Sequence, residues 1–97
     1  MKLILSRLAA IDLFEIFRDT IATFGQVQAE KYYRLILETF DLLIENPAAG
    51  HQRRDLSSTY LAFPVGQHII VYRFDFNLKE VIIMRVFHSR MDFTMRM

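Results

Sequence analysis

Three polar side chains that could carry chemistry follow the most strongly apolar stretch near the C-terminal end. Residues 81–87 are β-branched, apolar or aromatic with one arginine among them, which is typical of a strand buried on both faces. His88, Arg90 and Asp92 follow at a spacing of two, so they point the same way while the chain stays extended. An imidazole, a guanidinium and a carboxylate would then meet at the end of a central strand, where a functional site is expected. The alternative is a strand leaving the core, with Arg90 and Asp92 as a surface ion pair.

Ribonuclease chemistry is the catalytic option that these residues leave open. It requires cations that hold the scissile phosphate and a group that moves a proton. Four candidates could lie on neighbouring central strands: Arg73, Arg85, His88 and Arg90. Of these, His88 and Arg90 are the candidate catalytic residues. However, the two strands contain no lysine, and no tyrosine or histidine follows Asp92. Basic side chains on a sheet serve binding as readily as catalysis, so both uses stay open.

Other kinds of site are excluded or weakened by residue content. The chain has no cysteine, which rules out thiolate catalysis and disulfides, and its three glycines cannot build a phosphate-binding loop. His51, His68 and His88 fall in a predicted loop, a strand and a strand end, without the paired spacing of a zinc site. We therefore predict neither a bound metal nor a cofactor.

The composition predicts one domain, 1–97, that interacts with another protein. Its 97 residues can bury a core without metal or disulfide support. Hydrophobic residues make up 53%, including nine phenylalanines, and so small a domain has difficulty hiding that much apolar surface. An exposed patch for a protein partner is therefore expected. No apolar run could span a bilayer and no secretory leader is recognisable, so we predict a cytoplasmic location and no membrane contact.

The net charge of +1 conceals an uneven distribution. Residues 1–46 hold five Lys/Arg against seven Asp/Glu, whereas residues 47–97 hold seven against four. The second half is therefore mildly basic. Its charge is not clustered, and the isoelectric point of about 8.1 is below that of most nucleic-acid-binding domains. We predict no sequence-specific DNA binding by this chain alone.

The first half of the chain predicts a strand and two helices. Residues 1–5 read as a short strand, and Ser6 takes the position of a helix N-cap. The first helix has its predicted core face at Ala10, Phe14, Phe17, Ile21 and Phe24, widened by Ile11 and Leu13, and its predicted solvent face at Asp12, Glu15, Arg18 and Asp19. The second helix, 26–45, has its apolar positions at Ala29, Tyr33, Ile36, Phe40 and Leu43. Because Gly25 alone separates them, the helices must fold back as an antiparallel hairpin.

The second half predicts three strands. Residues 47–59 lack periodicity and are interpreted as a loop. Its basic residues are Arg53 and Arg54. Strands are predicted over 60–63, 67–76 and 81–88, the first of them at an edge because Pro64 cannot donate to a ladder. The result is an α+β fold (order β-α-α-β-β-β), in which the two-helix antiparallel hairpin packs on one face of a mainly antiparallel four-stranded sheet.

Residues distributed along the whole chain match a known family. In the helical half they are Ala10, Asp12, Leu13, Ile16, Phe24, Gly25, the run 28–32, Phe40, Leu43, Asn46, Pro47 and Gly50. In the strand half they are Tyr60, Phe63, the run 68–70, Tyr72, Arg73, Ile82, Ile83, Arg85, Val86 and the run 88–92. In this order and spacing the chain resembles the RelE/ParE superfamily of bacterial toxins from type II toxin–antitoxin modules, and within it the ParE branch, sometimes called plasmid stabilisation proteins. It departs from the common pattern at His51, where an arginine usually follows the glycine.

This resemblance implies a small cytosolic toxin that arrests growth unless a cognate ParD-like antitoxin holds it. ParE-like proteins are described as stalling DNA gyrase so that broken DNA accumulates, whereas the RelE-like branch cuts messenger RNA in the ribosome. The small number of basic residues favours the gyrase inhibitor, which acts by binding. A ribosome-dependent endoribonuclease using His88 and Arg90 is the alternative, and a binding module without toxicity is a third reading.

The resemblance also implies how partners bind. Antitoxins of this family dock a helix and an extended segment along the toxin's sheet and helical hairpin. The residues expected to hold the antitoxin are Tyr60, Phe63, Tyr72, Arg73, Arg85 and Arg90. Those expected to contact the target are Arg53, Arg54 and Arg90.

Overall fold

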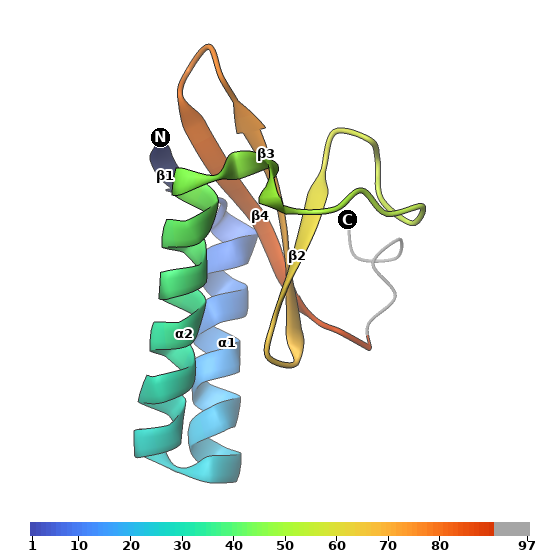
Figure 1. Cartoon of the computed structure of the whole chain (residues 1–97). Helices are drawn as coiled ribbons and strands as arrows, with labels where there is room; N and C mark the ends of the chain where they lie inside the picture. Colours follow the sequence, from blue (N-terminus) through green and yellow to red (C-terminus); the bar gives the residue numbers. More distant parts are fainter. Residues whose placement is uncertain (91–97) are drawn as a thin grey trace.

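The computed structural model describes residues 1–90, so Asp92 lies outside the described residues. The elements are β1 (Lys2–Leu5), α1 (Arg7–Phe24), α2 (Gln26–Glu45), the short 3₁₀ helix η1 (Pro47–Ala49), β2 (Leu61–Val65), β3 (His68–Asp75) and β4 (Glu80–His88) (Figure 1). The predicted α+β fold and its order, β-α-α-β-β-β, are confirmed. Within the described part of the chain, no helix is long and apolar enough to cross a membrane.

The four strands form one sheet in the order β1-β4-β3-β2. β3 is antiparallel to both β2 and β4, while β1 is parallel to β4. The sheet is therefore mainly antiparallel, and Pro64 lies in the edge strand β2, where its missing N–H costs no ladder bond with a further strand. Both helices lie on the same side of the sheet (Figure 1).

Gly25 makes the tight joint between the helices. Its backbone angles, φ 88° and ψ 169°, lie in a region that is essentially restricted to glycine. Its N–H donates to the Ile21 carbonyl, and its carbonyl accepts from the Ala29 N–H, so one residue ends α1 and begins α2. At the other end of α1, the Ser6 hydroxyl accepts the Ala9 N–H at 3.0 Å, as expected of an N-cap. The joint itself extends beyond the strands (Figure 1).

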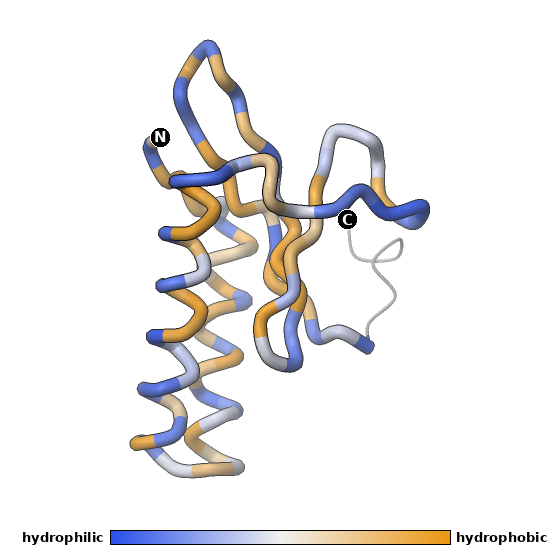
Figure 2. The backbone as a smooth tube through the Cα atoms, viewed as in Figure 1, coloured by the Kyte–Doolittle hydropathy of each residue, from blue (hydrophilic) through white to orange (hydrophobic). Residues whose placement is uncertain are grey.

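The main core lies between the helices and the sheet. Its buried members are Ala9, Leu13, Ile36, Phe40, Leu43, Val65, Ile70, Tyr72, Val81, Ile83 and Val86. A smaller cluster on the opposite face of the sheet centres on Val71 and Phe87, with Leu56, Tyr60, Ile69 and Met84 packed against them. Figure 2 shows hydrophobic residues along β3 and β4 and hydrophilic residues in the loop before β2. The sheet is therefore covered by apolar side chains on both faces.

The predicted core face of α1 is wrong, whereas that of α2 is largely right. On α1, four of the five predicted residues are exposed: Ala10, Phe14, Ile21 and Phe24. The buried residues are Leu13, which widened the predicted face, and Ala9 and Asp12, which were not predicted, because α1 packs against α2 and β4 together and Asp12 has a buried partner there. On α2, four of the five are buried as predicted: Ala29, Ile36, Phe40 and Leu43.

β4 contains a bulge that changes which side chains face the helices. Two adjacent residues of β3 pair with Arg85 and Ile83, so Met84 is left over in β4. The extra residue shifts the alternation, and Ile83 and Val86 both enter the helix-side core while Met84 and Phe87 lie on the other face.

The strand ends at His88 and a turn follows at 89–90. The prediction that His88 and Arg90 point the same way from an extended strand is therefore wrong.

Candidate functional site

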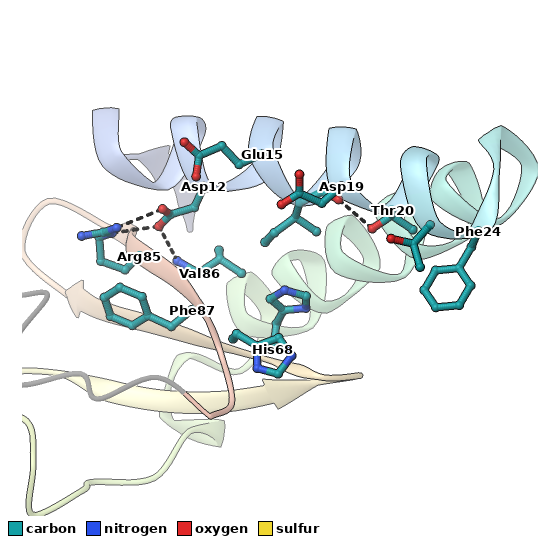
Figure 3. A pocket seen from close by; sticks show the side chains of 12 residues that line it. Asp12, Glu15, Asp19, Thr20, Phe24, His68, Arg85, Val86 and Phe87 are labelled. Carbon is teal, nitrogen blue, oxygen red and sulfur yellow. Dashed lines mark hydrogen bonds and ion pairs between the residues drawn. The ribbon is translucent and has the colours of Figure 1, made fainter.

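A cleft of about 520 Å³ lies between α1 and the C-terminal half of β4 (Figure 3). From α1 it is lined by Asp12, Glu15, Ile16, Asp19, Thr20, Thr23 and Phe24. From the sheet it is lined by His68, Arg85, Val86, Phe87 and His88. The cleft thus collects three carboxylates, two imidazoles and a guanidinium from segments far apart in the sequence.

The cleft lies beside the part of β4 that continues past the end of β1. β1 stops at Leu5, opposite Ile83, and side chains of the following segment then take the place of a neighbouring strand. The Ser6 N–H donates to the Ile83 carbonyl at 2.9 Å, and the Ser6 hydroxyl donates to the Met84 carbonyl at 2.6 Å. The Asp12 carboxylate accepts the Val86 N–H at 3.0 Å. These three main-chain groups of β4 are therefore satisfied without a strand beside them.

Asp12 also binds Arg85 through two parallel hydrogen bonds. Arg85 Nε donates to Oδ2 at 2.8 Å, and Nη2 donates to Oδ1 at 3.0 Å (Figure 3). The Arg85 and Asp12 side chains are 17% and 10% exposed, so the pair is largely removed from water. The hydrogen bonds to Asp12 raise the pKa of Arg85 and keep the guanidinium charged. The guanidinium carbon also lies 4.6 Å from the centre of the Phe87 ring. Arg85 therefore fastens α1 to β4.

His68 and His88 form a pair at the other end of the cleft. They are directly opposite each other in β3 and β4, and their rings meet edge to face with centroids 5.4 Å apart. The Tyr32 hydroxyl lies 2.6 Å from Nδ1 of His68, and Arg90 donates its backbone N–H to Nδ1 of His88 at 3.2 Å. Burial, and secondarily the neighbouring His88, lower the pKa of His68. His68 is therefore neutral at pH 7.

The remaining charges make the cleft electronegative at neutral pH. Asp12 is neutralised by Arg85, which leaves Glu15 and Asp19 on the α1 wall. Arg18 lies 3.3 Å from Asp19, but both side chains are more than 60% exposed, so solvent screens this pair. Among the described residues, no group of three or more potential metal ligands comes together. The arrangement suits a ligand with a cationic or neutral polar group and disfavours a polyanion.

The residues predicted to hold the antitoxin do not share one face. Tyr72 is fully buried on the helix side, where its hydroxyl donates to the Pro47 carbonyl and accepts the Gly50 N–H. Phe63 packs on the same side. Tyr60 packs on the opposite face, and the alternation of β3 places Arg73 there as well. Arg85 lies in the cleft, and Arg90 is exposed in the turn after β4.

The residues predicted to contact the target lie in two segments. Arg53 and Arg54 are in the loop between η1 and β2, whereas Arg90 follows β4. Arg53 donates to both carboxylate oxygens of Asp55, at 2.9 and 2.8 Å, which lowers the pKa of Asp55. Arg54 is exposed.

Comparison with known proteins identifies the family. The chain matches the sequence pattern of the family described as "ParE toxin of type II toxin-antitoxin system, parDE" over residues 3–93. The chain belongs to the ParE toxin family. It is 31% identical to Toxin ParE1 of Caulobacter vibrioides over 88 residues, covering 91% of this chain and 88% of that protein. It is also 31% identical to Toxin ParE1 of Mycobacterium tuberculosis over 91 residues, covering 94% and 92%.

Two solved structures share the fold of this ParE-family chain. A chain from the chromosomal ParDE toxin–antitoxin system of P. aeruginosa superposes with a TM-score of 0.79 at 23% identity, covering 93% of this chain and 97% of that chain. A chain from the RelBE2 toxin–antitoxin complex of Mycobacterium tuberculosis gives a TM-score of 0.63 at 22% identity, covering 90% and 95%. The chain is thus a toxin of a type II toxin–antitoxin system by family, with a fold found in both ParDE and RelBE assemblies.

Two site residues of this ParE-family toxin escaped the sequence analysis. Asp12 was assigned to the solvent face because it lies among Glu15, Arg18 and Asp19 on the helix. His68 was placed in a predicted strand without a histidine partner at the spacing of a zinc site. The pairing of His68 could have been found from the sequence. Counting back along both strands from the turn at 77–80 brings His68 near His88 across the hairpin.

Proposed function

We propose that this ParE-family toxin arrests growth by binding DNA gyrase and that a ParD-like antitoxin neutralises it. The family membership supports a toxin with an antitoxin partner, and a structure from a ParDE system has the same fold. The target and the partner are the parts that need experiment.

The charge of the cleft is the observation that favours binding over RNA cleavage. A ribonuclease that cleaves messenger RNA must attract a polyanion and stabilise the negative charge that develops on phosphate. Here Glu15 and Asp19 stand on the wall opposite the two histidines, and the charge of Arg85 is neutralised by Asp12. The cleft therefore repels the phosphate backbone that such a reaction would have to place in it.

The outer face of the sheet, away from the helices, is the surface we assign to the antitoxin. It carries Tyr60 and Arg73 beside the small apolar cluster around Val71 and Phe87. An aromatic ring and an arginine next to apolar surface are the residue types that dominate the energy of protein interfaces. Phe63 and Tyr72 are excluded from this surface because they lie on the helix side. Arg90 is assigned to both the antitoxin contact and the gyrase contact.

A ribosome-dependent endoribonuclease is the second candidate, and the histidine pair is the observation that favours it. Two imidazoles whose rings are 5.4 Å apart could act as acid and base, with Arg90 in the following turn as a phosphate contact. In this alternative function, His88 and Arg90 are the catalytic residues.

The two candidates are separated by giving the purified chain two substrates. With gyrase and relaxed plasmid, we expect supercoiling to fail and cleaved DNA to accumulate. With translating ribosomes, we expect the message to stay intact. Cleavage of the message without any effect on gyrase would overturn the proposal in favour of the ribonuclease. If the folded chain affects neither gyrase nor the message, the proposal is overturned in favour of a binding module without toxicity.

The target surface is tested by Arg54→Ala and Arg90→Ala, with Arg7→Ala as the matched control. All three arginines are exposed, and Arg7 begins α1 far along the chain from the other two. Loss of an interface arginine commonly costs a factor of about ten or more in affinity, so half-maximal inhibition of gyrase should require about tenfold more of either variant. If Arg7→Ala is equally impaired, the effect is general and the assignment fails.

The antitoxin surface is tested by Arg73→Glu, with Lys79→Glu as the matched control. Both changes reverse one charge, but Lys79 is exposed in the β3–β4 turn rather than on the outer face. We expect Arg73→Glu to weaken antitoxin binding at least tenfold and Lys79→Glu to leave it within about twofold. Equal binding by wild type and Arg73→Glu would remove Arg73 from the interface.

A further inference from the structure

The turn after β4 is held by two hydrogen bonds, one of which depends on a histidine nitrogen. The Arg90 N–H donates to Nδ1 of His88 at 3.2 Å, and the Ser89 N–H donates to the Gln67 carbonyl at 2.9 Å. Because Nδ1 of His88 accepts, neutral His88 carries its proton on Nε2. An imidazolium has an N–H at both nitrogens and no acceptor. Protonation of His88 therefore necessarily removes the acceptor on which the Arg90 N–H depends.

The position of His68 adds to the effect of a proton on this pair. His68 is the direct cross-strand partner of His88, and the ring centroids are 5.4 Å apart. Two protonated imidazoles at this separation repel each other, as like charges directly opposite in a sheet do. His68 cannot easily move away, because the Tyr32 hydroxyl contacts its Nδ1 at 2.6 Å and also accepts the Gln67 N–H at 3.1 Å. The repulsion therefore acts mainly on His88 and the turn behind it.

The charged groups around the pair decide where His88 can go. From β4, Arg85 is already paired with Asp12 of α1, so neither offsets a new charge on the histidines. From α2, Tyr32 is neutral, because burial raises its pKa. From α1, Glu15 and Asp19 line the same cleft and are carboxylate acceptors. A protonated His88 thus loses the Arg90 N–H and is attracted to the carboxylates of the α1 wall.

We propose that the His68–His88 pair is a proton-operated latch: when both rings are neutral the Arg90 amide in this turn is bonded to His88, and protonation of His88 releases that amide. Arg90 is exposed and lies within this turn, so its presentation to a partner changes with the state of the latch. The latch is a property of this chain alone. It does not depend on gyrase or on any particular antitoxin.

The test follows the backbone amides of Ser89 and Arg90 by NMR while the pH of the isolated chain is lowered from about 8 to about 5, the range in which histidines titrate. In wild type we expect the Arg90 amide to shift and to become more mobile as the histidines take up protons. In His88→Gln this response should disappear, and the pKa of His68 should rise, because the neighbouring charge of His88 is the smaller of the two causes that lower it.

His51→Gln is the matched control, because His51 is exposed in the loop before β2 and far along the chain from the pair. It should leave the Arg90 response unchanged. His68→Gln provides a second variant, in which the Arg90 amide should still be released because His88 and its Nδ1 acceptor are intact. The proposal is overturned if the Arg90 amide keeps its position and order in wild type throughout the titration, or if His88→Gln responds as wild type does.

Discussion

The two halves of β4 are held in the sheet by different means. Residues 80–83 have β1 on one side and β3 on the other, so main-chain bonds supply both neighbours. Beyond Ile83, β1 is absent, and Ser6 and Asp12 bind the strand through side-chain atoms. Main-chain bonds tolerate almost any sequence, whereas side-chain bonds depend on two particular residues. The cleft lies along the second half, so the region with the chemistry is also the region that single substitutions can undo.

The largest effect is expected at Asp12. Asp12→Ala leaves the Arg85 guanidinium, which is 17% exposed, without its carboxylate and leaves the Val86 N–H without its acceptor. Removal of one partner of a buried pair costs about 3–5 kcal/mol, and we expect a loss of unfolding free energy in this range. Urea denaturation measures it.

Asp19→Ala is the control for Asp12→Ala. Asp19 is on the same helix, but its side chain is 71% exposed, so its loss should change stability by no more than about 0.5 kcal/mol. Comparable losses in the two variants would mean that the second half of β4 does not depend on Asp12.

A smaller effect is expected at Ser6. Its hydroxyl accepts the Ala9 N–H as the helix cap and donates to the Met84 carbonyl, so Ser6→Ala removes a cap and a tertiary bond together. We expect a loss of about 1–2 kcal/mol by thermal or urea unfolding. Ser58→Ala, in the exposed loop before β2, changes the same atoms without either contact and should be close to neutral. A Ser6→Ala variant as stable as Ser58→Ala would show that the strand does not need the hydroxyl.

The pH dependence of the unfolding free energy should report on the C-terminal end of β4, where His88 pairs with His68 of β3. Burial, followed by the charge of His88, lowers the pKa of His68 in the folded chain below its unfolded value of about 6.5. The unfolded chain then binds more protons between the two values. This contribution to stability is therefore complete above about pH 6.5 and is lost as the pH falls through the folded pKa.

The measurement for this prediction is the unfolding free energy between about pH 7.5 and pH 5. His68→Gln should show a shallower loss on acidification than wild type, and His51→Gln should follow wild type. If His51→Gln flattens the profile and His68→Gln does not, the titrating group has been misassigned.

Local signals in the sequence were sufficient for the order of elements but not for the site. Ser6, Gly25 and Pro64 each act on the backbone at or next to their own position, so the helix start, the hairpin joint and the edge strand could be predicted. Asp12 could not be, because its burial depends on Arg85, which is 73 residues away in the chain. Its polar neighbours on the helix pointed instead to solvent.

The same reasoning explains the errors on the strands. The bulge at Met84 is set by the packing of two faces at once and has no local sequence signal, and it moved Val86 into the helix-side core. Tyr72 looked like an interface aromatic, but its hydroxyl finds the Pro47 carbonyl and the Gly50 N–H in a segment that the sequence presented as a loop. Periodicity reports which residues alternate, whereas tertiary partners decide which polar groups are buried.

The smallest effect is expected in the first half of β4, at Lys2 of β1. The Lys2 side chain is exposed, while its N–H donates to the Lys79 carbonyl at 2.7 Å. Lys2→Ala should therefore change the unfolding free energy by less than about 0.5 kcal/mol, because β1 binds β4 through its main chain. Lys2→Pro keeps a side chain at the same position but removes the N–H, and it should cost about 1 kcal/mol. If Lys2→Ala proves as harmful as Lys2→Pro, side chains matter on both halves of β4 and the contrast between them disappears.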